Sequence, residues 1–105
     1  MKLIIQIPCF NEEDVLSIAL SDLPKDIKGI DDIEILIIDD GSTDNTVQVA
    51  KKFGVNHIVS IYENKGLANA YIKGLDACLK AGADIIVNTD ADNQYRADDI
   101  EKLVA

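Results

Sequence analysis

The strongest constraint on the fold is a unit that recurs along the chain: a short apolar run, a polar segment, and then apolar residues at helical spacing. The apolar runs are rich in β-branched residues and lie at 3–7, 33–38, 57–61 and 83–87. Four strands that alternate with four helices favour a parallel sheet with right-handed crossovers and helices on both faces. The sequence therefore predicts an α/β protein with three layers, α/β/α.

The helices are bounded by residues that favour helix ends. Asn11 is a suitable N-cap for a first helix that buries Val15 on its inner face and stops before Pro24. Gly54 and Gly82 follow the second and third helical patterns, where glycine commonly ends a helix. A fourth helix is expected from residue 97 onward.

The composition predicts one packed domain over residues 1–105. The chain is 48% hydrophobic and has no Ser-rich or low-complexity tract that would mark a linker. Its apolar runs are far shorter than a membrane span requires. Gln6 and Pro8 interrupt the apolar start of the chain, which argues against a signal peptide. We therefore expect a cytoplasmic protein.

The charge balance restricts the ligands. Ten Lys and Arg against 19 Asp and Glu give a formal net charge of −9 at pH 7. No basic cluster is present, so direct binding of nucleic acid is not expected. A ligand that carries phosphate would need a metal ion between it and the protein.

The cysteines and the single histidine are interpreted as structural. Cys9 and Cys78 are too few for a disulfide scaffold and lack the spacing of a zinc site, so we expect reduced thiols. Cys78 falls on the apolar face of a helical pattern, whereas Cys9 is expected in a loop, where a reactive role is the weaker alternative. His57 lies at the start of a strand, away from the expected binding edge.

Polar residues follow each predicted strand. Ligands of open α/β sheets bind beyond the carboxyl ends of the strands. The segments at that edge are 8–12, 39–44, 63–66 and 90–95. Because loops at strand ends are polar in most proteins, each segment taken alone carries little information.

The last of these segments holds a candidate metal site. Asp90, Asp92 and Gln94 alternate directly after an apolar strand, so in an extended chain their oxygens point to one side. Hard oxygen ligands suit Mg²⁺ or Mn²⁺, which accept further ligands from the phosphates of a substrate. The alternative is a solvated turn with Asp at a helix N-terminus, which would be favoured for a lone Asp-x-Asp.

The remaining candidate ligands each have a structural alternative. Asp40, at the end of the second strand, either caps a turn or accepts hydrogen bonds from the N–H groups of a nucleobase. Asn11 and Glu12 face the same edge, although helix capping explains both equally well. Lys65 is either a phosphate contact or part of an ordinary turn. Phe10 and Tyr95 flank the expected cleft and either stack on a base or pack against a loop.

Taken together, these segments resemble the family-2 glycosyltransferases in order and spacing, over essentially the whole chain. The motifs that carry the resemblance are Ile7-Pro8-Cys9-Phe10-Asn11-Glu12-Glu13, Ile37-Ile38-Asp39-Asp40-Gly41-Ser42-Thr43-Asp44-Asn45-Thr46, Asn64-Lys65-Gly66-Leu67 and Asp90-Ala91-Asp92-Asn93-Gln94-Tyr95. The Asp-Ala-Asp-x-Gln pattern is most similar to the branch that includes dolichol-phosphate mannosyltransferase and other polyprenyl-phosphate glycosyltransferases.

The resemblance implies the Rossmann-like, nucleotide-binding half of a GT-A fold, with about four parallel strands in the order 3-2-1-4. It implies an inverting glycosyltransferase of cell-wall or polysaccharide biosynthesis that takes a sugar from a UDP- or GDP-sugar. The acceptor would be a membrane lipid phosphate, reached at the cytoplasmic face of the membrane. The implied ligands of the nucleotide sugar are Pro8, Phe10, Asn11, Glu12, Ile38, Asp40, Lys65, Asp90, Ala91 and Asp92, and those of Mg²⁺ or Mn²⁺ are Asp90, Asp92 and Gln94.

Two other functions are alternatives to this one. A non-catalytic nucleotide-binding module is the stronger alternative, because family catalytic domains continue well beyond residue 105, where any acceptor base would lie. A phospho-receiver domain is weaker, because Pro8, Cys9 and Phe10 stand where an acidic pair is needed. We expect the 105 residues to be a truncated domain that transfers no sugar by itself and self-associates, either by pairing of the exposed edge of its fourth strand or by packing of uncovered apolar faces.

Overall fold

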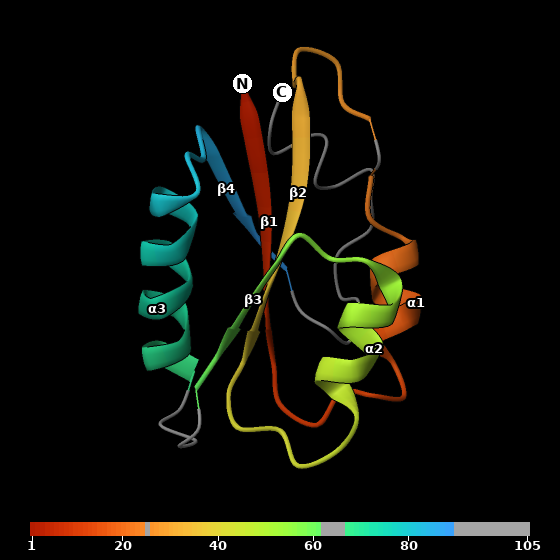
Figure 1. Cartoon of the computed structure of the whole chain (residues 1–105). Helices are drawn as coiled ribbons and strands as arrows, with labels where there is room; N and C mark the ends of the chain where they lie inside the picture. Colours follow the sequence, from red (N-terminus) through yellow and green to blue (C-terminus); the bar gives the residue numbers. More distant parts are fainter. Residues whose placement is uncertain (25, 62–66, 90–105) are drawn as a thin grey trace.

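The structure, a computed structural model, describes residues 1–24, 26–61 and 67–89, apart from the side chains of 67–71. Its centre is a parallel sheet of four strands in the order β3-β2-β1-β4 (Figure 1). The strands are β1 (Lys2–Cys9), β2 (Asp32–Asp39), β3 (His57–Ser60) and β4 (Ile85–Asn88). The predicted strand order is therefore confirmed.

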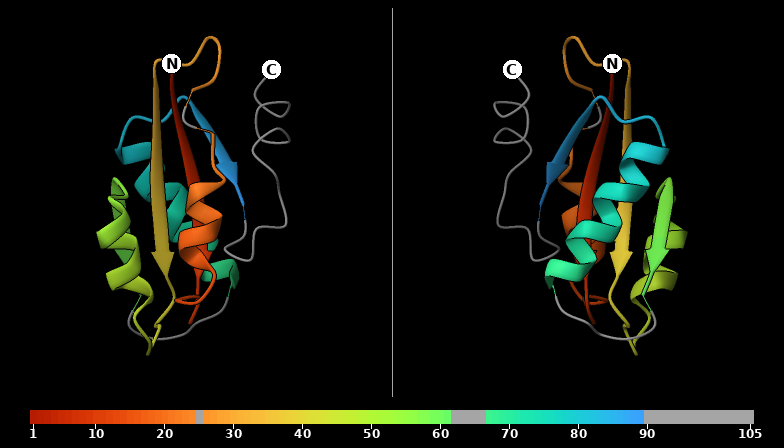
Figure 2. Two further views of the ribbon diagram at one scale, coloured as in Figure 1. Left: turned by 90° about the vertical axis from the view of Figure 1, so that its right-hand side faces the viewer. Right: turned by 90° about the vertical axis from the view of Figure 1, so that its left-hand side faces the viewer.

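Helices cover both faces of the sheet, as predicted. Helices α1 (Leu16–Ser21) and α2 (Thr46–Phe53) lie on one face, and α3 (Leu67–Lys80) lies on the other (Figure 2). Each connection returns the chain to the same end of the sheet, so all four strands point the same way. The fourth helix expected from residue 97 lies outside the described residues.

Alternation along β1 divides the core into two clusters. Leu3, Ile5 and Ile7 face α1 and α2, whereas Ile4 packs with Cys78 of α3. The four β1 side chains are fully buried. Burying an aliphatic side chain of this size contributes roughly 1.5–3 kcal/mol, so the central strand anchors both layers.

Helix α3 packs unusually close to the sheet at Gly74. A Cβ atom at this position would lie 3.0 Å from Cγ1 of Ile38 and would collide with Cδ1 of Ile38 and Oε1 of Gln6. Gln6 is itself fully buried and donates a hydrogen bond from Nε2 to Oδ1 of Asn88. Its Oε1 accepts a weak hydrogen bond, 3.7 Å long, from the Cys78 thiol. The missing side chain of Gly74 therefore leaves room for a polar contact inside the core.

The first helix differs from the prediction. It begins at Leu16, four residues later than expected, and Val15 is 36% exposed. Asn11 is not its N-cap, because Asn11 adopts a left-handed φ of 53° and its side chain bonds to the loop after β2. The polar residues before the helix serve contacts between loops instead.

Strand β1 also runs further than predicted. It continues through Pro8 to Cys9, and Pro8 pairs with Ile38 of β2. Among the described residues, pairing with β4 ends at Gln6, so no β4 carbonyl requires an N–H from Pro8. Cys9 is therefore a buried strand residue, and its expected place in a loop was wrong.

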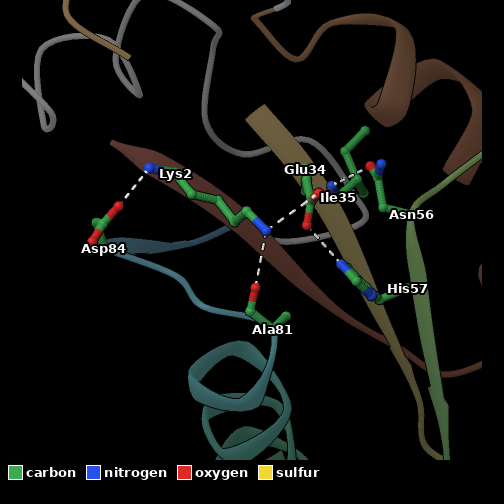
Figure 3. A network of polar contacts seen from close by, with 7 residues as sticks. All are labelled: Lys2, Glu34, Ile35, Asn56, His57, Ala81 and Asp84. Atoms are coloured by element: carbon green, nitrogen blue, oxygen red, sulfur yellow. Dashed lines mark hydrogen bonds and ion pairs between the residues drawn. The ribbon is translucent and has the colours of Figure 1, made fainter. Parts of the chain in front are cut away.

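A network of charged and polar residues joins β1, β2 and β3 near their amino ends, at the edge of the sheet opposite to the carboxyl ends of the strands (Figure 3). Nε2 of His57 lies 2.7 Å from Oε1 of Glu34, and Nζ of Lys2 lies 3.7 Å from Oε2 of the same carboxylate. The hydrogen bond with His57 and the charge of Lys2 lower the pKa of Glu34, although its partial burial opposes them. These contacts confirm the structural interpretation of His57. No helix in the described part of the chain has the length and apolar character needed to cross a membrane.

Candidate nucleotide-binding site

The carboxyl ends of β1 and β2 are joined beyond the strands themselves. The N–H of Asp40 donates to the carbonyl of Cys9 over 2.9 Å, and the N–H of Ile61 donates to the carbonyl of Asp39 over 2.7 Å. These bonds extend the ladder past β2 on both sides. The backbone that carries Asp39 and Asp40 is therefore held as firmly as a strand.

The two adjacent acids at the end of β2 have different roles. Oδ1 of Asp39 accepts a hydrogen bond from the N–H of Ser42 over 3.1 Å and so closes the turn. Asp40 is only 7% exposed, and its buried Oδ1 has no hydrogen-bond partner among the residues that the structure describes. A buried acceptor without a partner costs roughly 1–3 kcal/mol, more if it is charged. This oxygen is the group that a ligand with N–H donors would satisfy.

The loops after β1 and β2 are bonded to each other through Asn11. Its Oδ1 accepts the backbone N–H of Thr43 at 2.8 Å and that of Asp44 at 3.4 Å. Its own N–H donates to Oγ of Ser42 over 2.9 Å. The side chain of Asn11 therefore points into the second loop.

The next two residues continue this pattern. The N–H of Glu12 donates to Oγ1 of Thr46 over 2.9 Å, and the N–H of Glu13 donates to Oδ2 of Asp44 over 3.3 Å. Thr46 is fully buried and donates its hydroxyl proton to Asp44. Burial opposes ionisation of Asp44, but the hydrogen bonds from Thr46 and Glu13 outweigh it and lower the pKa of this carboxyl.

Cys9 lies beside this loop pair but is not suited to nucleophilic chemistry. Burial raises the pKa of its thiol to about 12, and the neighbouring carboxylates of Glu12 and Asp39 add to the rise. A thiol reacts as the thiolate, so Cys9 stays inert near neutral pH.

The other predicted ligands are placed as follows. Pro8 is half-buried, Phe10 is 43% exposed, and Ile38 is fully buried in the core cluster under α3. Thr89 is buried, and its N–H donates to the carbonyl of Gln6 over 3.2 Å, which brings the chain to the same edge just before Asp90. Lys65, Asp90, Ala91, Asp92, Gln94 and Tyr95 lie outside the described residues.

Two groups of residues were missed in the sequence. The first group accepts hydrogen bonds from the loop after β1 and consists of Ser42, Asp44 and Thr46. Its signal in the sequence was a run of short polar side chains after a strand, which is typical of turns that bond to nearby backbone. The Gln6–Asn88 pair was signalled by one amide in each of two apolar runs. Within the described residues, no group of three or more His, Cys, Asp or Glu is arranged to hold a metal ion.

The arrangement of this sheet and its helices is shared with solved nucleotide-sugar-binding proteins. S. aureus TarS 1-349 in complex with UDP-GlcNAc matches with a TM-score of 0.75 at 21% identity, over 99% of this chain and 30% of that chain. The mannosyltransferase PcManGT from Pyrobaculum calidifontis, in complex with GDP-Man and Mn²⁺, matches with a TM-score of 0.66 at 22% identity, over 86% of this chain and 27% of that chain. The fold is therefore that of the GT-A glycosyltransferases.

The family is shown by sequence. The pattern of "Glycosyl transferase family 2" matches residues 4–105, so the chain belongs to this family. The UDP-N-acetylglucosamine–dolichyl-phosphate N-acetylglucosaminyltransferase of Methanococcus voltae is 34% identical over 93% of the chain and 44% of its own length. The dolichol-phosphate mannosyltransferase of Pyrococcus furiosus is 32% identical over 99% of the chain and 29% of its own length. The chain thus spans less than half the length of these curated relatives.

Proposed function

We propose that this chain is the donor-binding part of an inverting glycosyltransferase that uses a nucleoside-diphosphate sugar. The observation that carries the proposal is the buried Oδ1 of Asp40, which lacks a partner among the described residues at the carboxyl edge of the sheet. Uracil and guanine both present ring N–H donors, so either base satisfies this oxygen. The hydrogen-bonded backbone on both sides of Asp40 holds this oxygen in place before the nucleotide binds.

The acceptor in this proposal is a polyprenyl phosphate. It is supported by the relatives from M. voltae and P. furiosus, whose names include dolichyl or dolichol phosphate. An oxygen of the lipid phosphate would form the new bond to the anomeric carbon while the bond to the nucleoside diphosphate breaks. Because that oxygen is already ionised at neutral pH, this acceptor needs no protein base to remove a proton.

The proposal includes a divalent metal ion, for which Asp90, Asp92 and Gln94 would be the protein ligands. Its support is the alternation of three oxygen-bearing side chains in the sequence and the Mn²⁺ named with PcManGT. When bound, Mg²⁺ or Mn²⁺ supplies positive charge beside a diphosphate that a chain of net charge −9 would otherwise repel.

Calorimetric titration tests the proposal. UDP and GDP are each titrated into the wild-type chain and into Asp92→Asn, with and without Mn²⁺, and Asp14→Asn serves as an exposed control in the same chain. We expect one nucleotide to bind when Mn²⁺ is present, and about tenfold weaker binding in Asp92→Asn only. Failure of both nucleotides to bind in the presence of Mn²⁺ contradicts the proposal. Equal affinity in all conditions removes the metal from it.

A further inference from the structure

Asn11 was predicted to touch the nucleotide sugar, but its surroundings suggest a different role. It is the non-glycine residue with a positive φ, 53°, among the residues described, a conformation that asparagine tolerates better than most side chains. In this turn the exposed side chain of Asn11 reaches Thr43 and Asp44 in the second loop. In the sequence, Asn11 directly precedes Glu12 and follows Pro8 by three residues.

The carboxamide oxygen is fully used by the protein. It accepts the N–H of Thr43 at 2.8 Å, the N–H of Asp44 at 3.4 Å and the hydroxyl of Thr43 at 3.4 Å. A carbonyl oxygen has two lone pairs, so these donors occupy the Asn11 oxygen, and a direct contact with a ligand would have to come from the N–H groups of the carboxamide.

The bonds of Asn11 are part of a larger clamp between the two loops. Three consecutive N–H groups, those of residues 11–13, donate to side chains of the loop after β2 and of Thr46, the first residue of α2. The Asn11 carboxamide is the contact that runs in the opposite direction, from a side chain of the first loop to the backbone of the second. We call these contacts of 11–13 with Ser42, Thr43, Asp44 and Thr46 the loop clamp.

The loop clamp is connected to the candidate site because Asp40 lies at the start of the second loop, two residues before Ser42. The N–H of Asp40 bonds to Cys9, two residues before Asn11, and Ser42 bonds to both Asp39 and Asn11. The loop that leaves Asp40 is thereby fixed to the loop that carries Phe10 and Glu12. A displacement of either loop would move these side chains relative to the open oxygen of Asp40.

We propose that Asn11 is a positioning residue for the donor nucleotide, acting through the loop clamp and not by contact with the ligand. The inference rests on the proposed nucleotide-binding function and adds to it the device that sets the distance between the two loops. Binding is stronger when the groups that meet the ligand are held in place beforehand, because less freedom is lost on association.

Two variants separate the conformation of Asn11 from its hydrogen bonds. Asn11→Gly keeps the left-handed backbone available but removes the carboxamide oxygen. Asn11→Asp keeps an oxygen acceptor at the same place and also tolerates the left-handed conformation. Asn45→Gly is the matched control, because Asn45 is exposed in the same loop and makes no side-chain cap hydrogen bond.

The first measurement is amide hydrogen exchange without ligand. We expect Asn11→Gly to lose protection at the amides of 12, 13, 43 and 44, and Asn11→Asp to retain most of it. The second is the dissociation constant of UDP or GDP with Mn²⁺ present. We expect binding about tenfold weaker in Asn11→Gly, within about threefold of wild type in Asn11→Asp, and unchanged in Asn45→Gly.

The outcomes distinguish this inference from the proposed function. Wild-type protein that binds neither nucleotide overturns both. Wild-type binding that is unchanged in Asn11→Gly overturns the inference alone, as does equal weakening in Asn11→Gly and Asn11→Asp, which would indicate direct contact through the amide group. Weakening in Asn11→Gly, with binding within about threefold of wild type in Asn11→Asp, supports it.

Discussion

At the scale of single residues, adjacent acids at the end of β2 divide two tasks. Asp39 closes a turn through Ser42, whereas Asp40 keeps a buried oxygen without a partner in the described part of the chain. A protein retains such a group against its cost in folding free energy when the group serves another purpose. A ligand that donates a hydrogen bond to this oxygen would remove the cost and so gain binding free energy.

Cys9 gives a prediction for the pH dependence of stability. Its thiol pKa rises from an ordinary value of 9.0 to about 12 on folding, first because of burial. Below pH 9 the thiol is protonated in both states and has no effect. Above pH 9 the unfolded chain alone loses the proton, so the free energy of unfolding falls by up to about 1.4 kcal/mol per pH unit.

Urea denaturation at several pH values between 8 and 11 measures this effect. We expect a steeper loss of stability in the wild-type protein than in Cys9→Ala, whose unfolded state has one thiol fewer to ionise. Equal slopes in the two proteins would show that Cys9 ionises as readily in the folded state as in the unfolded one.

Gly74 gives a second residue-scale prediction. Gly74→Ala raises helix propensity by about 1 kcal/mol, but the new Cβ meets Ile38 and Gln6. Overpacking of a filled core costs roughly 1–3 kcal/mol, and a shift of the Gln6 side chain would also disturb its hydrogen bond to Asn88. We therefore expect a net loss of stability of about 1 kcal/mol or more, measured by urea denaturation beside the exposed neighbour variant Lys73→Ala. A Gly74→Ala protein as stable as wild type would mean that α3 can move away from the sheet without cost.

At the scale of elements, the sheet was predictable because much of its two central strands, β1 and β2, is buried between the helix layers. Runs such as 33–38 are almost wholly apolar, and the helical spacing between them left a parallel α/β arrangement as the consistent answer. Gly54, with a φ of 94°, ends α2 where the sequence predicted. The local sequence was therefore sufficient to predict those elements whose apolar pattern matches their burial in the structure.

The start of α1 and the role of Asn11 were not predictable in the same way. Asn11 and the acids after it have a composition typical of a helix start, yet their N–H groups bond to residues more than 30 positions away. Tertiary hydrogen bonds thus replaced the local cap. The same limit applies to Asp40, whose position the sequence indicated but whose open oxygen depends on the packing of two loops.

At the scale of the whole molecule, β4 is an edge strand among the described residues. It pairs with β1 on one side, and Ile85 and Ile86 are half-buried. An edge with unpaired backbone groups and apolar side chains favours pairing with another chain. We propose that the 105-residue chain self-associates through this edge.

Light scattering during size-exclusion chromatography measures that association. We expect the apparent mass to rise with protein concentration toward that of a dimer, because edge pairing is reversible. A mass equal to one chain at every concentration would contradict the proposal and would leave the site and fold unaffected.

The central claim is that Asp40 supplies the acceptor that a nucleobase satisfies, and Asp40→Ala tests it most directly. The variant is titrated with UDP, GDP and ribose 5-phosphate in the presence of Mn²⁺, beside wild type and the exposed control Asp14→Ala. We predict that nucleotide binding weakens at least about tenfold in Asp40→Ala, since leaving a buried N–H of the base without its acceptor costs roughly 1–3 kcal/mol. Ribose phosphate binding should stay close to that of wild type, and the thermal midpoint should not fall, because the substitution removes a buried acceptor without a partner among the described residues. Nucleotide affinity equal to that of wild type in Asp40→Ala would contradict the account.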